Sequence, residues 1–261
     1  MITSTPYDQV EVYGQAVAPG GVAGVVQLQI ERPDSRNALD TEHCNLLHEA
    51  VEAAVRAGAR ALVITGQGSS FCAGADFGEV YSDGFRQALY AALHAVNQAP
   101  LPVIAAVNGP AIGAGTQLAI ACDFRVAAAS ARFAVPTAHL GLAIDPWTIR
   151  RLALVAGNRV ARGMLMAGAE YDQAKALVGG LVDRVGTLSD ALEWAAELAR
   201  LAPLTLAYSK RVLDAGPRSR TDTEPLEAEL AAAFEACWSS DDFAEGRAAR
   251  VEKRRPHFRG R

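Results

Sequence analysis

Two runs of small residues, each following an apolar run of β-strand character, constrain this chain more than any other feature. The first run is FCAGAD at 71–76, and the second is NGPAIGAGTQL at 108–118. Glycine and alanine let another molecule lie directly against the backbone, because they carry little or no side chain. Peptide N–H groups in such loops can hold a carbonyl oxygen. The two runs therefore predict a binding site built largely from main chain.

The pattern around these runs predicts alternating strands and helices. Apolar runs that fit buried strands occupy 22–30, 61–65, 103–107, 124–127 and 181–185. Segments with helical spacing lie between them, at about 41–57, 84–98 and 115–121, and Asp40 is placed to cap the first. Strands that alternate with helices indicate an α/β fold.

The end of the chain has a different pattern, in which only helices are expected. They cover about 191–201, 205–213, 225–238 and 242–254, with Ser189 and the Thr221–Glu224 pair as helix starts. Pro217–Thr223 reads as a short polar loop. We expect a boundary between an α/β core at 1–188 and a helical region at 189–261.

Composition excludes several classes of protein. Half of the 261 residues are hydrophobic and the formal net charge is −4, which is ordinary for a globular protein and gives no sign of nucleic-acid binding. No apolar run is long enough for a membrane span, and Met1–Pro6 lacks the pattern of a signal peptide. The cysteines Cys44, Cys72, Cys122 and Cys237 have no paired spacing, so reduced thiols in a cytoplasmic protein are expected.

Other interpretations of the two runs are weaker. Each could be a tight strand-to-helix turn with no ligand. A dinucleotide fingerprint, GxGxxG, that began at Gly113 would need glycine at 118, where the chain has Leu118. A phosphate-binding P-loop is excluded because no Gly-Lys-Ser/Thr occurs.

Further motifs stand around the two runs in a fixed order: RNAL at 36–39, ACDFRVA at 121–127, FAVP at 133–136 and GLVD at 180–183. In this form and order the chain resembles the enoyl-CoA hydratase/isomerase, or crotonase, superfamily, from about residue 22 to 259. The resemblance implies a crotonase-like (ClpP/crotonase) fold of stacked ββα units, followed by a helical trimerisation region. It also implies binding of acyl-CoA thioesters in the cytoplasm by a homotrimer or a dimer of trimers.

The resemblance assigns the thioester oxygen to two backbone donors, the N–H groups of Ala75 and Ala114. Chemistry next to a thioester passes through an enolate-like state, whose oxyanion two fixed donors can stabilise by several kcal/mol. Ala114 stands where glycine is common in the family. Its methyl group keeps the N–H but narrows the approach.

The two catalytic glutamates of hydratases fall at Gln117 and Thr137 in this chain. Neither side chain can exchange a proton efficiently near neutral pH. General acid–base catalysis typically contributes ~10²–10⁴-fold per group, so the standard hydratase route should be crippled. The chain resembles actinobacterial members that lack these glutamates and are thought to carry or sense acyl-CoA in lipid metabolism.

Asp145 matches a position where some relatives, among them dienoyl-CoA isomerases and an aryl dehalogenase, carry a catalytic aspartate. Asp145 followed by Pro146 is also a strong helix-start signature, and an N-capping carboxylate is a weakened base. Both interpretations stay open. His139 lies near the acyl site or is structural, and Trp147 packs in the core or lines the acyl pocket.

The CoA contacts also follow from the resemblance. The backbone around Asn37, Ala38 and Ala73 should run along pantetheine and adenine, Arg36 should face phosphate, and Asp76 belongs to the same substrate-binding set. Arg250 and Lys253 correspond to residues that contact the nucleotide, usually of a neighbouring subunit. The basic tail at 253–261 is then a phosphate-binding edge, or simply a solvated helix end. No cofactor beyond the CoA of the ligand and no metal site is expected.

Three hypotheses result. The chain binds acyl-CoA without turnover, or it is an isomerase or hydrolase that uses Asp145, or it is a slow enoyl-CoA hydratase in which Gln117 orients water.

Overall fold

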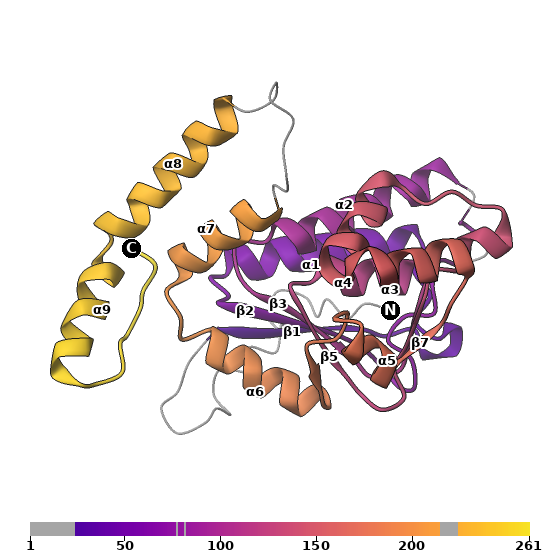
Figure 1. The fold of residues 1–261 in the computed structure, drawn as a ribbon, viewed down its shortest axis with the longest axis horizontal. Helices are drawn as coiled ribbons and strands as arrows, with labels where there is room; N and C mark the ends of the chain where they lie inside the picture. Colours follow the sequence, from indigo (N-terminus) through magenta and orange to yellow (C-terminus); the bar gives the residue numbers. More distant parts are fainter. Residues whose placement is uncertain (1–23, 77, 81, 215–223) are drawn as a thin grey trace.

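The computed structural model describes residues 24–261 apart from 77, 81 and 215–223. Its central feature is a twisted sheet flanked by helices, with a helical extension at one end (Figure 1). The expected absence of a signal peptide at Met1–Pro6, and the loop at Pro217–Thr223, lie outside the described residues. The α/β class predicted from the alternation is confirmed.

The main sheet has five parallel strands in the order β1-β2-β3-β5-β8. These strands are β1 (Val25–Ile30), β2 (Ala61–Gly66), β3 (Val103–Val107), β5 (Phe124–Ala127) and β8 (Arg184–Val185). All six residues of β2 are buried. A parallel sheet has helices on both faces, so its inner strands carry continuous apolar runs. This explains why the inner strands β2, β3 and β5 are recognisable in the sequence.

Alternate side chains of the strands enter two separate cores. Leu28, Leu62 and Ile64 pack in the larger core with helices α1 (Thr41–Arg56) and α2 (Asp83–Gln98). Val63 and Ile104 face the other way, against helix α6 (Leu188–Leu198). Figure 1 shows α1 and α2 above the sheet and α6 below it. The sheet is therefore a fixed platform whose strand ends position the loops.

A second sheet was not expected from the sequence. It contains β4 (Pro110–Ile112), β6 (Arg132–Ala134) and β7 (Tyr171–Asp172), with β4 parallel to β6 and β6 antiparallel to β7. Strands of two or three residues are too short to show a period. β4 lies inside the second small-residue run, which this sheet therefore helps to fix.

Three further helices complete the core. Helix α3 (Ala114–Ala121) follows β4 and is buried along its whole length. Helix α4 (Pro146–Ala167) is interrupted at Gly157, whose φ of 78° is not helical, and α5 (Gln173–Val178) is short. The Asp145–Pro146 pair predicts only the start of α4.

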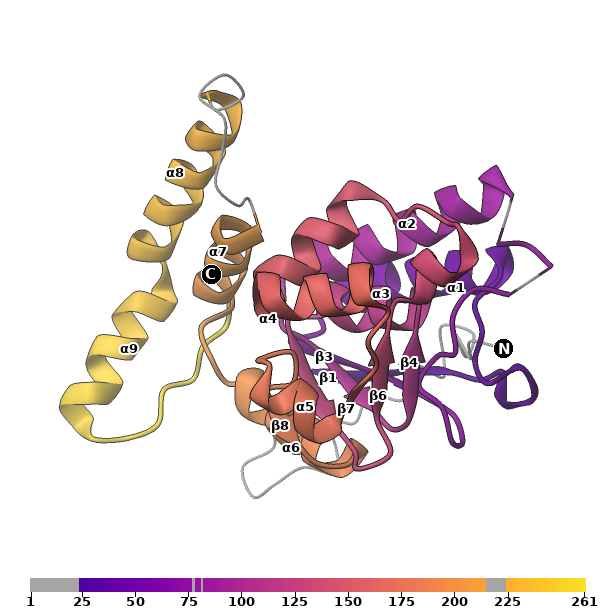
Figure 2. The same cartoon turned by 45° about the vertical axis from the view of Figure 1, so that its right-hand side comes forward.

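The C-terminal helices α7 (Pro203–Asp214), α8 (Glu224–Ser239) and α9 (Asp241–Glu252) begin and end within two residues of their predicted bounds. Helix α6 begins earlier than expected, because Thr187 rather than Ser189 is its N-cap and forms a capping box with Asp190. Figures 1 and 2 show α8 and α9 at one end of the molecule, away from the sheet. Lys210 of α7 holds that helix to the core through Asp123, at 2.8 Å.

The four cysteines are free, and three of them are buried. Burial raises the pKa of the Cys72 and Cys122 thiols to about 12, and the pKa of Cys44 still further. Cys237 on α8 is half-buried. Among the described residues, none of the helices has the length and apolar character that crossing a membrane would require.

Candidate functional site

The two small-residue runs lie against each other, backbone to backbone. Phe71 N–H and Cys72 N–H both donate to Pro110 O at 3.1 Å, and Ile112 N–H donates to Cys72 O at 2.9 Å. A Cβ added to Gly115 would lie 2.0 Å from Cys72 O, which no real structure tolerates. Glycine at 115 is therefore what allows the second loop to approach the first.

Ala75 sits in the first loop with an unused backbone donor. Leu39 N–H donates to Gly74 O at 2.8 Å, and Asp76 N–H donates to Leu39 O at 2.7 Å. These bonds use the backbone groups on both sides of Ala75. In the part of the chain that the structure describes, the Ala75 N–H itself has no backbone acceptor. The neighbouring bonds hold this free donor in place.

Ala114 presents a second free donor at the start of α3. The preceding Gly113 has φ 54° and ψ −112°, and its N–H donates to Ala134 O at 2.8 Å. The first N–H groups of a helix have no partner within that helix. No backbone acceptor for the Ala114 N–H occurs among the described residues. Both donors predicted from the sequence are thus available to a ligand.

Both alanines line one cavity of about 260 Å³. Of the predicted site residues, Ala73, Ala75, Ala114, Gln117 and Thr137 line it. Most of the remaining lining is apolar and comes from the loops, α2 and the segment before α4: Gly74, Val80, Phe85, Leu89, Ile112, Gly113, Pro136, Leu140, Leu142, Ala143 and Ile144. The cavity suits an apolar group whose polar end meets the two N–H groups.

Gln117 is buried on α3 and bonded to the start of α4. Its Nε2 donates to Thr148 Oγ1 at 2.8 Å and to Asp145 Oδ2 at 3.3 Å. Thr148 Oγ1 in turn donates to Asp145 Oδ2 at 2.5 Å. Thr148 was not predicted as a site residue. Thr148 is the third residue of the helix that Asp145 caps, so the sequence predicts that its N–H donates to Asp145. Nothing in the sequence indicates that its hydroxyl contacts Gln117.

Asp145 is the N-cap of α4, as one of its two interpretations requires. Its Oδ1 accepts from Thr148 N–H at 3.0 Å. With the bonds to Oδ2, both oxygens of the carboxylate are occupied as acceptors. Asp145 therefore lies beside the cavity and holds Gln117, which lines it.

The sequence does not predict that one wall of the cavity is formed by α2. Phe85, Arg86, Leu89 and Tyr90 of α2 line it. The i, i+4 spacing of Phe85 with Leu89 and of Arg86 with Tyr90 could have placed each pair on one face. Burial, and then the charge of Asp145, raise the pKa of the Tyr90 hydroxyl.

Asn37 supports the first loop from beneath and is fully buried. Its Nδ2 donates to Ser70 O at 2.7 Å and to Gln67 O at 2.9 Å, and its Oδ1 accepts from Arg32 N–H at 2.9 Å. Asn37 and the exposed Arg36 both have positive φ, at 60° and 52°. The Asn37 side chain is thus used within the protein, and only its backbone and its neighbours can meet a ligand.

Ala38 and Asp76 lie beside this turn. Arg32 donates to Ala38 O at 3.0 Å and pairs with Asp76 at 2.9 Å. The Gly78 N–H and the Arg32 guanidinium hold the pKa of Asp76 below its usual value. Neither residue lines the cavity, so any ligand contact would be at its rim.

His139 and Trp147 also lie outside the cavity lining. His139 is exposed, with its ring against Gly168, where an added Cβ would lie 2.1 Å from Nε2. Trp147 is partly buried against the larger core, and its ring centroid is 5.3 Å from that of His94.

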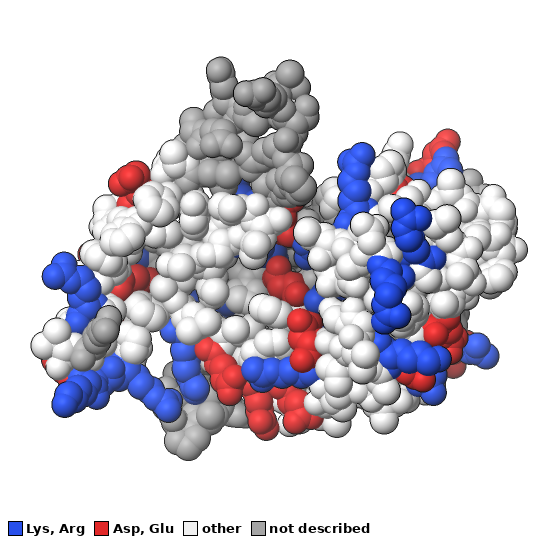
Figure 3. Space-filling view, in the orientation of Figure 1, with Lys and Arg blue, Asp and Glu red and all other residues white. Residues whose placement is uncertain are grey.

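Lys253 directly follows α9, and Arg250 belongs to that helix. Helix α9 is far from α2, which contributes to the cavity lining, in both views of the fold (Figures 1 and 2). Basic side chains are exposed at this end of the molecule, and others are exposed on its opposite, right-hand side (Figure 3). Lys253 is exposed and has a positive φ of 54°. Lys253, at the end of α9, therefore lies remote from the cavity of its own chain.

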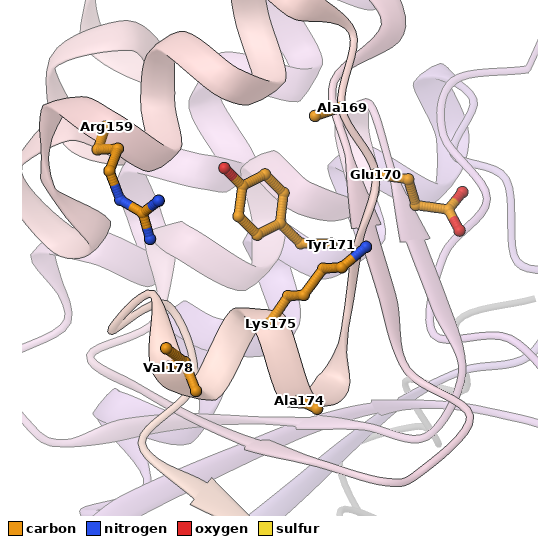
Figure 4. Close-up of a pocket in the computed structure, with 7 residues that line it drawn as sticks. All are labelled: Arg159, Ala169, Glu170, Tyr171, Ala174, Lys175 and Val178. Atoms are coloured by element: carbon orange, nitrogen blue, oxygen red, sulfur yellow. The ribbon is translucent and has the colours of Figure 1, made fainter.

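Two other cavities contain none of the predicted site residues. One, of about 470 Å³, is lined by residues of α4, α5 and β7 (Figure 4). The other, of about 530 Å³, lies between α7, α8 and α9 and includes Tyr208, Phe234 and Trp238. No cluster of three His, Cys, Asp or Glu side chains that could hold a metal ion occurs within the described residues.

Comparisons with known proteins place this chain in a family. The family model for enoyl-CoA hydratase/isomerase matches residues 20–261. A Mycobacterium tuberculosis protein named "Probable enoyl-CoA hydratase echA6" is 44% identical over 237 residues, which cover 90% of this chain and 96% of that protein. The 2,3-dehydroadipyl-CoA hydratase of Escherichia coli is 35% identical over 252 residues, covering 91% and 96%.

A solved structure shows the same fold. The enoyl-CoA hydratase of Bacillus anthracis superposes with a TM-score of 0.80 at 30% identity, covering 91% of this chain and 96% of that one. The family resemblance and the crotonase-like fold predicted from the motifs are confirmed. This chain belongs to the enoyl-CoA hydratase/isomerase family.

Proposed function

We propose that the protein binds acyl-CoA thioesters, with the thioester oxygen held by the N–H groups of Ala75 and Ala114. The observation that carries the proposal is the pair of unused, fixed N–H donors at one apolar cavity. A thioester is an apolar chain with one strong acceptor, which this arrangement matches. The binding of fatty acyl groups follows from the apolar lining.

Efficient hydration of an enoyl group is not part of the proposal. Gln117 and Thr137 line the cavity but supply neither a general acid nor a general base near neutral pH. Both carboxylate oxygens of Asp145 are occupied as acceptors within the protein, and Asp145 is not part of the cavity lining. The geometry therefore supports binding over an isomerase or hydrolase that depends on Asp145.

We propose that residues of two subunits contact the nucleotide of CoA. Arg36 is exposed beside the first loop, whereas Lys253 stands at the far end of the chain. A second copy is needed to bring its Lys253, and with it Arg250, to the site. We propose a homotrimer or a dimer of trimers, working in the cytoplasm.

The C-terminal helices carry the apolar surface that such an assembly needs. Large apolar side chains are exposed on α7, where Leu213 is 71% exposed, on α8, where Trp238 is 56% exposed, and on α9, where Val251 is 82% exposed. Exposed apolar patches of this kind mark interaction surfaces. Sedimentation of the purified protein tests this part separately, and a monomer at micromolar concentration would contradict it.

Calorimetric titration with butyryl-CoA and with free CoA tests the binding proposal, together with mass-spectrometric detection of products from enoyl-, dienoyl- and saturated acyl-CoAs. We expect binding without product. The variant Ala114→Pro removes one N–H at the first position of a helix, where proline is tolerated. It should weaken butyryl-CoA binding by about 2–10-fold, the value of one neutral hydrogen bond.

Ala114→Gly is the matched control, because it keeps the N–H and removes only the methyl group. Its affinity should stay near that of the unaltered protein. Equal affinities for both variants would refute the role of the Ala114 N–H, and robust turnover of any acyl-CoA would refute a pure binding protein.

A further inference from the structure

The contacts of Gln117 determine which end of its amide faces the cavity. A carboxylate can only accept hydrogen bonds, so the group that meets Asp145 Oδ2 at 3.3 Å must be the amide NH₂. The Thr148 hydroxyl donates its single proton to Asp145. Its oxygen can therefore only accept a hydrogen bond from the Gln117 amide, at 2.8 Å from Nε2 to Oγ1. Two independent neighbours thus require the same orientation.

The carbonyl oxygen of Gln117 is left for the cavity. Gln117 lines the cavity, whereas Asp145 and Thr148 do not. Within the described residues, Oε1 receives no hydrogen bond from the protein, and it is not among the buried atoms that lack a partner. At this position the cavity therefore contains a fixed hydrogen-bond acceptor, Gln117 Oε1, and the NH₂ of the same amide is not available to a ligand.

The acceptor lies close to the position proposed for the thioester. Gln117 is three residues after Ala114 on α3. Residues three apart on a helix share a face, with about 5–6 Å between their Cβ atoms. Oε1 can then meet a substituent on the acyl carbons next to the thioester, rather than the end of a long chain.

We infer that Asp145 and Thr148 are positioning residues, which lock the Gln117 amide so that the site selects a hydrogen-bond donor on the acyl group over an acceptor. The inference rests on the proposed function and adds a ligand preference to it. A hydroxyl near the thioester can donate to Oε1. A ketone at the same carbon places its oxygen against Oε1 and is rejected.

Calorimetric titration with three matched ligands tests this preference. They are 3-hydroxybutyryl-CoA, acetoacetyl-CoA and butyryl-CoA, which carry a donor, an acceptor and neither at the same carbon. We expect the hydroxyacyl thioester to bind about tenfold more tightly than the oxoacyl thioester, from one hydrogen bond gained and one unpaired acceptor avoided.

The variant Asp145→Asn tests the lock itself. Asparagine is also a strong N-cap, so the start of α4 is kept. It can present either an oxygen or an NH₂, so the Gln117 amide is free to turn. The ratio of the two affinities should then fall to about threefold or less, whereas a role of Asp145 in α4 alone would leave the ratio unchanged.

Gln117→Met provides a second variant that does not depend on the α4 cap. It removes the acceptor at similar volume, so 3-hydroxybutyryl-CoA should bind no better than butyryl-CoA. Equal affinity of the unaltered protein for the hydroxyacyl and oxoacyl thioesters overturns the inference but leaves the proposed function standing, provided that butyryl-CoA binds. Failure of all three thioesters to bind overturns both.

Discussion

Two parts of the cavity lining are built in different ways, one from main chain and one from side chains. The wall formed by the two loops offers peptide N–H groups, which are fixed by backbone contacts such as that of Gly115 with Cys72 O. A second part of the lining, the side-chain wall, is formed by the side chains of Gln117 and Thr137. A single substitution can replace a side chain, but it cannot replace a peptide group without disturbing the fold. The main-chain part of the cavity is therefore less easily altered by substitution than its side-chain part.

The largest expected effect comes from Gly115→Ala, which attacks the main-chain wall. The added Cβ would meet Cys72 O at 2.0 Å, and the loops would have to separate. We expect a loss of about 3 kcal/mol or more in the free energy of unfolding, or failure to fold. Urea unfolding measures this loss.

Gly84→Ala on α2 is the control, because nothing lies within 4 Å of the added methyl group. It should be neutral or slightly stabilising, since alanine favours helix over glycine by up to about 1 kcal/mol. A stable, acyl-CoA-binding Gly115→Ala protein would show that the loop contact is dispensable.

The second effect tests the side-chain wall. Gln117→Glu with Thr137→Glu introduces two carboxyl groups at the cavity, and hydration of crotonyl-CoA should rise by about 10²-fold or more. The carboxylate introduced at position 117 would face Asp145, so adding Asp145→Asn should increase the rate further by removing a like charge. Absorbance of the enoyl thioester follows the reaction. No gain in either variant would mean that more than these two positions limits the chemistry.

The smallest effect concerns Asp40. Its carboxylate forms an ion pair at 3.3 Å with the guanidinium of Arg32, which also pairs with Asp76 of the first loop. Burial by itself raises the pKa of Asp40, but the bonds from His43 and the charge of Arg32 outweigh it, so the folded pKa lies below 3.8. A lowered pKa stabilises the fold above the unfolded value, and this contribution is lost as the pH falls through the folded value.

Asp40→Asn keeps the cap of α1 and should cost up to about 1 kcal/mol at pH 7. The difference should shrink at about pH 3, below the unfolded pKa, because the stabilisation is lost as the pH falls towards the lowered folded pKa. Urea unfolding at both pH values checks this. A difference that does not change with pH would assign the effect to packing rather than to charge.

The same contrast explains what could be predicted from the sequence. The buried strands and the two loops follow from local patterns, because apolar runs and small residues report directly on burial and close approach. The wall formed by Arg86 and Tyr90 and the bond from Gln117 to Thr148 depend on how α2 and α4 are docked. Docking is decided by tertiary packing, which no short pattern records. The second sheet was missed because its strands are too short to carry a period.

The burial of three of the four thiols has a practical consequence. An alkylating reagent attacks the thiolate, and Cys44, Cys72 and Cys122 are both enclosed and held protonated. Cys237 is the accessible thiol, and it borders the cavity between α7, α8 and α9. A maleimide dye added to the native protein should therefore label one site per chain. Its fluorescence would report whether another copy of the chain covers that surface, without any engineered cysteine.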